Sequence, residues 1–142
     1  MSLTKLVFIQ SSTNSDSIHT KVPLNGTVGS LEVVSGGTYS DSLQCSWELN
    51  FPQESSVNLS WDYIDTENHS KCKYDWVQVL DLTHDSQLVY GRKLCGSLNP
   101  TNLKLLNVMV RGTRRLLVSF RSDEDTQRRG FRMVYQAFSR PC

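Results

Sequence analysis

Three acidic residues stand close together in the segment DTENHSKCKYDWVQVLD, which spans residues 65–81. Asp65, Glu67 and Asp75 surround a cysteine and precede an alternating apolar run. Converging carboxylates repel one another and raise one another's pKa, so a cation or a basic side chain must neutralise them. A hard cation such as calcium takes several oxygen ligands, whereas acids in a turn commonly just face solvent. The segment therefore raises two interpretations, a metal site or a solvated loop.

Two arginine clusters in the segments RGTRR and QRR offer a different chemistry, the binding of a glycosaminoglycan or another polyanion. Their members are Arg111, Arg114, Arg115, Arg128 and Arg129. A charge run of this kind usually forms a solvated face, so polyanion binding is the alternative function. Lys and Arg together number 15 against 14 Asp and Glu. Because the chain has no overall basic excess, a nucleic-acid partner is not expected.

Motifs of catalysis are missing from the sequence. The chain contains no nucleophile elbow, no HExxH and no phosphate-cradling glycine loop. Its three histidines, His19, His69 and His84, lie in polar stretches typical of loops. We therefore expect a protein that is not an enzyme.

The four cysteines, Cys45, Cys72, Cys95 and Cys142, have neither the CxxC nor the paired Cys/His spacing of a structural zinc site. A disulfide framework is the better interpretation, although the spacing alone does not give the connectivity.

Glycosylation signals accompany the cysteines. The N-x-S/T sequons are at Asn25 (NGT), Asn58 (NLS) and Asn68 (NHS). Together with the cysteine pattern they favour an extracellular location, either as a secreted protein or as an ectodomain. No apolar run has the length of a membrane-spanning helix, so we expect no membrane insertion by this segment.

Short β-strands must position these residues. The clearest is VNLSWDY, which predicts one face carrying Val57, Leu59, Trp61 and Tyr63. The segments CSWEL, WVQVLD, LLVSF and FRMVYQAF alternate in the same way. The last of them places on one side Phe131, Met133, Tyr135 and Ala137. No segment has a convincing helical stripe.

Many short strands separated by turn formers favour an all-β fold, an antiparallel jelly-roll β-sandwich whose two sheets bury their alternating faces. At 142 residues the chain has the size of one domain. We expect residues 1–25 to be an N-terminal arm, linker or tag-derived segment and residues 26–139 to be the domain. Residues 140–142 are expected to be a tail or the start of a next domain.

Read in order, the segments CSWELNFP, VNLSWDYIDTE, CKYDWVQVLD, GRKLCG, LLVSFRSD and RRGFRMVYQAF resemble the successive landmarks of a CUB domain. The resemblance spans residues 26–138. It implies an extracellular jelly-roll β-sandwich that serves as a binding module and has no catalytic activity of its own.

The resemblance also implies a disulfide between Cys72 and Cys95, which would stabilise the fold by about 3 kcal/mol in the chain-entropy model. The first cysteine of the family pattern is missing, and Cys45 matches its usual partner. Cys45 is then a buried thiol outside any disulfide, a partner of Cys142, or a residue whose mate lies beyond this sequence. Cys142 equally resembles the first cysteine of a following domain.

A subset of CUB domains binds calcium at one end of the sandwich. The residues that match its ligands here are Glu67, Asp75 and Asp123, and the resemblance therefore implies calcium as the cofactor. The main chain of Asp125 and the side or main chain of Thr126 are expected to help complete the oxygen shell. Asp65 matches no ligand position and is expected to be a solvated or turn residue.

In related domains, acids at the calcium rim accept a lysine from an extracellular protein partner. The resemblance thus gives a second role to Glu67, Asp75 and Asp123. Tyr74 and His69 are expected as further partner contacts because they lie nearby in the sequence, whereas Trp76 is expected to pack.

Overall fold

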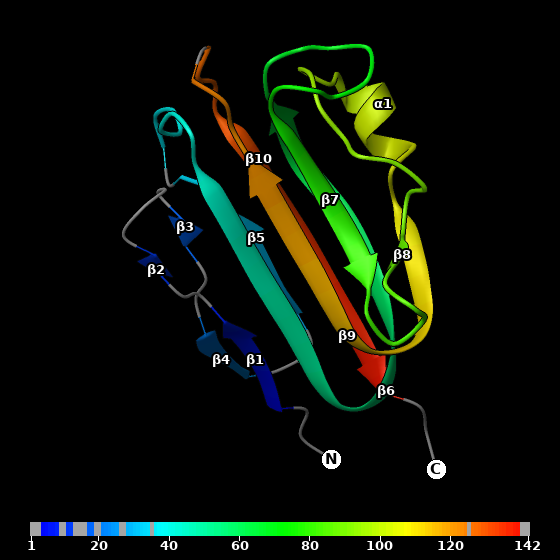
Figure 1. Cartoon of the computed structure of the whole chain (residues 1–142). Coiled ribbons are helices and arrows are strands. Elements are labelled where there is room, and N and C mark those ends of the chain that lie inside the picture. Colours follow the sequence, from blue (N-terminus) through cyan, green and yellow to red (C-terminus); the bar gives the residue numbers. More distant parts are fainter. Residues whose placement is uncertain are drawn as a thin grey trace.

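A computed structural model describes residues 4–8, 11–12, 17–18, 21–25, 28–34, 36–124 and 126–139, and Figure 1 shows the whole chain. Strands dominate the described residues. They are β1 (Thr4–Phe8), β2 (Ser11–Ser12), β3 (Ser17–Ile18), β4 (Lys21–Asn25), β5 (Val28–Glu32), β6 (Gln44–Asp65), β7 (Trp76–Asp81), β8 (Gln87–Leu88), β9 (Val108–Arg121) and β10 (Gly130–Ser139). The described residues contain no helix that is long and apolar enough to cross a membrane.

The two longest strands, β6 and β9, build both layers of the sandwich. Residues 44–50 of β6 pair with residues 115–121 of β9, and the pairing then shifts register twice between Asn50 and Val57. Beyond the shifts, β6 pairs with the first part of β9 on one side and with β10 on the other. Both strands bend at one end of the molecule (Figure 1), so the sheet folds back over itself. The predicted antiparallel jelly-roll β-sandwich is confirmed.

The remaining strands extend these layers. β7 pairs with β9 and β8, and β10 pairs with β5, all antiparallel. Within residues 1–25, where an arm, linker or tag-derived segment was expected, the described strands β1 and β4 pair with each other, and β1 also pairs with β6. The short β3 joins β6 in a parallel pair.

The core lies between the layers and is centred on Phe131. Its ring centroid lies 5.5 Å from those of Trp47 and Trp61 and 6.0 Å from that of Phe120. The predicted inner face of β10 is confirmed, because its four members are all fully buried. Aromatic side chains from β6, β9 and β10 thus interlock across the sandwich.

One residue predicted for the inner face of β6 lies elsewhere. Val57, Leu59 and Trp61 are buried, but Tyr63 is only half-buried. Tyr63 and Trp61 pair with the consecutive residues Arg132 and Met133, so β6 carries one extra residue, a β-bulge, at this point. The bulge reverses the alternation of side chains, and Ile64 takes the inward position at 1% exposure. The prediction for Tyr63 was therefore wrong.

The disulfide between Cys72 and Cys95 is confirmed, with Cα atoms 5.5 Å apart. It ties the loop after β6 to the segment before α1. Close to it, the main chains of Val77 and Leu94 exchange two hydrogen bonds of 2.9 and 2.8 Å. Cys45 carries a buried thiol, and Cys142 lies outside the described residues.

A short helix, α1 (Pro100–Lys104), forms although no segment of the sequence has a convincing helical stripe. Asn99 caps it by accepting a 2.8 Å hydrogen bond from the main-chain N–H of Asn102, and a proline occupies its first turn. Five residues are too few to show a helical stripe in a sequence, which explains why the sequence did not predict it.

We expect Phe131→Ala to lower the free energy of unfolding by about 3–5 kcal/mol, because the substitution leaves a cavity among three aromatic rings. Phe138→Ala is the matched control in the same strand, since Phe138 is 44% exposed and should cost less than about 1 kcal/mol. Urea unfolding without reductant measures both. Equal losses in the two variants would contradict the assignment of Phe131 to the core.

Removing the disulfide should lower the free energy of unfolding by about 3 kcal/mol, because the bond closes a loop between cysteines 23 positions apart. The double variant Cys72→Ser/Cys95→Ser tests this by urea unfolding. Cys45→Ser serves as the control for loss of a thiol alone. Recovery of Cys72 and Cys95 as separate thiols from oxidatively folded wild-type protein would contradict the bond itself.

Candidate functional site

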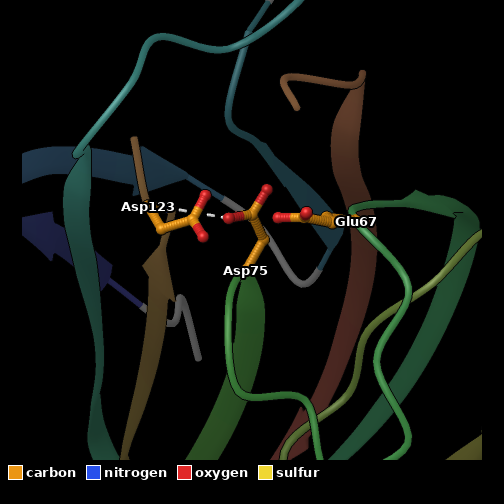
Figure 2. A group of neighbouring side chains, drawn as sticks. All are labelled: Glu67, Asp75 and Asp123. Carbon is orange, nitrogen blue, oxygen red and sulfur yellow. Dashed lines mark hydrogen bonds between the residues drawn. The ribbon is translucent and has the colours of Figure 1, made fainter. Parts of the chain in front are cut away.

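Three predicted metal ligands converge at the end of the sandwich opposite the bends of β6 and β9. Figure 2 shows the carboxylates of Glu67, Asp75 and Asp123 facing one another, and one oxygen of each lies within 4.8 Å of the others. Glu67 follows β6, Asp75 directly precedes β7, and Asp123 follows β9. Antiparallel pairing brings the start of β7 next to the end of β9, so residues distant in the sequence meet here.

Asp75 is the buried centre of this cluster, with no exposed surface. Its Oδ2 accepts a hydrogen bond from the hydroxyl of Tyr39, and its Oδ1 accepts one of 2.8 Å from the main-chain N–H of Asp123. Tyr39 is itself buried, and its ring packs edge-on against Phe120 at 5.0 Å. The carboxylate of Asp75 therefore has a fixed orientation before any ion binds.

Sequence reasoning missed Tyr39. It stands in the segment SGGTYSD, whose glycines and serines indicated only a turn. No spacing relates Tyr39 to Asp75, because the contact depends on the tertiary fold. The one available signal was a large aromatic residue within an otherwise small and polar segment.

The loop that carries Asp123 is held by a buried serine. The main-chain N–H of Leu43 donates to Ser122 Oγ at 2.8 Å, and that hydroxyl donates to the carbonyl of Ser40 at 2.7 Å. The N–H of Ser42 donates to the carbonyl of Asp123 at 2.8 Å. These bonds fix the main chain of Asp123 against the segment before β6.

Glu67 approaches from the opposite side and is held through its neighbour. Thr66 is fully buried; its N–H donates to the carbonyl of Gly96 at 3.0 Å, and its Oγ1 accepts from the N–H of Gly96 at 2.8 Å. One carboxylate oxygen of Glu67, Oε2, is buried and has no hydrogen-bond partner among the described residues. A buried carboxylate oxygen without a partner costs free energy unless a ligand satisfies it.

The electrostatics of the cluster disfavour three ionised carboxylates. Burial is the largest cause that raises the pKa of Asp75, and the nearby Asp123 adds to it, while the hydrogen bond from Tyr39 opposes it. Desolvation, then Asp123, then Asp75 raise the pKa of Glu67. The ionised cluster therefore costs free energy that a bound cation would offset.

The donor set suits a hard cation. It consists of carboxylate oxygens from three segments and includes no histidine nitrogen or cysteine sulfur. Calcium and magnesium prefer such oxygens, whereas zinc and copper sites in proteins use imidazole or thiolate. The unpartnered Oε2 of Glu67 and the mutual repulsion of the acids both fit an ion at this position.

One of the two expected auxiliary ligands, Thr126, lies at the cluster. Thr126 reaches the cluster, since its side chain hydrogen-bonds Glu67 and lowers the pKa of that carboxyl. Asp125 lies outside the described residues. Asp65 accepts hydrogen bonds from the hydroxyl of Ser97 and from the N–H of Arg129 and does not belong to the cluster.

The predicted partner contacts Tyr74 and His69 lie in the loop between β6 and β7. Their ring centroids are 4.7 Å apart in an edge-on arrangement, and Tyr74 is 43% exposed. His69 Nδ1 accepts the N–H of Lys71 at 3.0 Å, which fixes the ring within the loop.

The structure does not bring the two arginine clusters together. Arg111, Arg114 and Arg115 lie in β9 near its bend, whereas Arg128 and Arg129 directly precede β10 at the opposite end (Figure 1). Arg115 forms an ion pair with Glu48, and the guanidinium of Arg129 stacks on Tyr63 at 4.0 Å. A single polyanion-binding patch is therefore not formed by these five residues.

The sequons occupy different settings. Asn58 is exposed in the middle of β6, and Asn68 is exposed next to Glu67. Asn25 ends β4, and its side chain lies outside what the structure describes.

Comparison with known proteins gives relatives in curated sequences. Blastula protease 10 of Paracentrotus lividus is 32% identical over 102 residues, which cover 70% of this chain and 15% of that protein. Procollagen C-endopeptidase enhancer 2 of Mus musculus is 32% identical over 101 residues, which cover 71% of this chain and 22% of that protein. The chain thus spans less than a quarter of the length of these relatives.

Solved structures share the fold. The CUB1-EGF-CUB2 region of human MASP-1/3 aligns with a TM-score of 0.65 at 20% identity, covering 80% of this chain and 42% of that one. The MASP-1 CUB2 domain bound to Ca2+ aligns with a TM-score of 0.61 at 23% identity, covering 78% of this chain and 92% of that one. The family profile of the CUB domain matches residues 21–135. With this match over most of its length and the jelly-roll sandwich described above, the chain belongs to the CUB domain family.

Proposed function

We propose that this chain is an extracellular, non-catalytic module that recognises a protein partner through a calcium-ordered acidic surface. The observation that carries the proposal is the convergence of Glu67, Asp75 and Asp123, with the buried Oε2 of Glu67 lacking a hydrogen-bond partner among the described residues. Further support comes from the solved MASP-1 CUB2 domain, which is described as bound to Ca2+. The disulfide and the exposed Asn58 and Asn68 of two sequons support an extracellular location.

Each ligand has a distinct task in this proposal. Asp75 is oriented in advance by Tyr39 and by the N–H of Asp123, so it contributes a fixed anchor. Glu67 and Asp123 approach from two different loops and would hold the ion between them, with Thr126 and Asp125 adding oxygens. Calcium supplies positive charge that neutralises the acids and joins the loops. The loops that carry Glu67 and Asp123 would then keep one conformation, so less conformational entropy would be lost when a partner binds.

The partner would contact the half-buried rim of the cluster. Glu67 and Asp123 retain exposed surface, whereas Asp75 is completely buried and lies out of reach of another protein. We therefore keep Glu67 and Asp123 as acceptors of a lysine from the partner and assign Asp75 to the ion alone. The exposed ring of Tyr74 and the adjacent His69 lie beside this rim and complete the proposed surface.

Calcium should raise the melting temperature of the protein, and chelation should lower it. An ion that binds only the folded state stabilises it by about 2.7 kcal/mol at a hundredfold excess over Kd. Asp123→Asn should abolish the difference between calcium and chelator, because it removes a charged ligand from one loop. Glu124→Gln is the matched control, since it removes the same charge from the exposed neighbouring residue.

Differential scanning calorimetry in calcium and in chelator measures this effect for the wild type and both variants. An identical melting temperature for the wild-type protein in the two buffers, across millimolar calcium, would overturn the metal site. A loss of the calcium effect in Glu124→Gln equal to that in Asp123→Asn would place the ion elsewhere.

Lysine recognition should depend on calcium and on Glu67. We expect a peptide with one central lysine to shift the amide NMR signals of residues 66–75 in calcium, and the lysine-to-glutamine peptide to leave them in place. Glu67→Gln should abolish the shifts, whereas Asp85→Asn, at an exposed acid near β8, should not. Shifts of equal size in chelator would separate lysine binding from the ion and contradict the proposed coupling.

A further inference from the structure

A groove of about 620 Å³ lies beside the proposed metal site and shares Asp123 and Tyr74 with the site and its rim. Three basic side chains line it, Lys73, Lys93 and Arg121. Its lining also includes the aromatic side chains of Tyr74 and Trp76 and the acidic side chains of Asp123 and Glu124. The groove therefore presents basic, aromatic and acidic side chains together.

The covalent framework and the sheet hold the basic side chains together. The disulfide joins the segment KCK, residues 71–73, to the segment RKLC, residues 92–95, so two basic segments lie side by side. The two main-chain hydrogen bonds between Val77 and Leu94 fix the neighbouring Lys93 beside β7. Trp76 and Arg121 are direct partners in the antiparallel ladder of β7 and β9. The proximity of the basic side chains thus follows from the disulfide and from the pairing of the strands.

No ion pair of the described residues neutralises these three positive charges. The ion pairs of the described residues join His84 to Asp81, Arg115 to Glu48 and Arg132 to Asp62. None of them involves Lys73, Lys93 or Arg121, which are all exposed.

The aromatic residues give the groove a surface that is not purely ionic. Lys93 Nζ lies 4.2 Å from the ring centroid of Trp76, a cation–π contact that holds the ammonium group over the groove. Trp76 is half-buried, and Tyr74 is 43% exposed, so both rings can contact a ligand. The packing role expected for Trp76 accounts for only part of its surface.

We infer that this groove binds an acidic peptide segment of a protein partner, with Lys73, Lys93 and Arg121 receiving its carboxylates. Charge complementarity favours this occupant. A long sulfated polysaccharide fits less well, because Asp123 and Glu124 in the same lining repel its repeating negative charges. A peptide can instead present one or two carboxylates to the basic side chains and apolar side chains to Tyr74 and Trp76.

The inference rests on the basic side chains of the groove and not on Asp123, the proposed calcium ligand that also lines it. The basic side chains contact neither Glu67 nor Asp75 in any described interaction, and their positions follow from the disulfide and the β7–β9 ladder. Binding in the groove should therefore persist in chelator, where lysine recognition at the rim is lost. An experiment can therefore contradict peptide binding in the groove without contradicting calcium-dependent lysine recognition at the rim, and the reverse is also true.

Titration of the isotope-labelled full chain by NMR tests the inference, with acetylated and amidated tetraglutamate peptide as the probe in chelator and low salt. We expect shifts of the Trp76 indole N–H and of the amides of Lys73 and Lys93, and no such shifts with tetraglutamine. Lys93→Gln and Arg121→Gln should each weaken binding about fivefold, and added salt should weaken it further. Lys104→Gln, in α1 and outside the groove, is the matched control for loss of one charge and should have no effect.

Three results would overturn the inference. The first is an absence of groove shifts at millimolar peptide, and the second is an equal effect of Lys104→Gln and Lys93→Gln. The third is a heparin tetrasaccharide that binds more tightly than the peptide and is weakened by Lys93→Gln, which would assign the groove to a sulfated glycan. The dispersed spectrum of each variant confirms that it is folded, and Arg121→Gln provides the test if Lys93→Gln does not fold.

Discussion

Hydrogen bonding between β6 and β9 is the constraint on which the sandwich depends. Each strand is long enough to serve both layers, and both bend at the same end, where their register shifts. The opposite end is therefore the place where β6 and β9 finish and β7 and β10 begin (Figure 1). Glu67, Asp75 and Asp123 meet there because the strands end there, and the aromatic core around Phe131 keeps the layers at a fixed separation.

The burial of Asp75 then determines which interactions the acidic cluster at that end of the sandwich requires. A carboxylate with no exposed surface needs hydrogen bonds and a compensating charge, and the protein supplies the former through Tyr39 and the N–H of Asp123. The positive charges nearest in the groove, Lys73, Lys93 and Arg121, are exposed and form no described ion pair with the acids. Acidic and basic side chains thus lie next to each other without a described ion pair between them.

Much of the fold followed from the sequence, because strict alternation of apolar residues is a local property. The inner face of β10 and most of that of β6 were predicted for this reason. Tyr63 was misplaced because a single extra residue reverses the alternation, and nothing in VNLSWDYID marks it. The bulge is defined by the register of Arg132 and Met133 on β10, which is information from a distant strand.

The residues of the candidate site likewise fall into those that the sequence predicted and those that only the tertiary fold brings together. Glu67, Asp75 and Asp123 were predicted from a family pattern, and the structure brings them together. Tyr39 and the basic groove were not predicted, because each arises from contacts between segments without a shared spacing. Lys73 and Lys93 become neighbours through the disulfide and the main-chain hydrogen bonds between Val77 and Leu94, and Arg121 joins them through its ladder position opposite Trp76.

The late position of β9 and β10 in the chain has a consequence during biosynthesis. β6 leaves the ribosome before β9 and β10, which pair with most of its length, whereas the earlier strands β1 and β3 pair only with residues 48–50 and 44–45. During that interval most of its backbone groups lack their strand partners, and Trp47 and Trp61 lack the core that buries them. Topologies rich in such distant pairings fold slowly, and unpaired strands of this kind associate with one another readily. Cys72 and Cys95 are both available in that interval, so an oxidising compartment can close their loop before the sheet is complete.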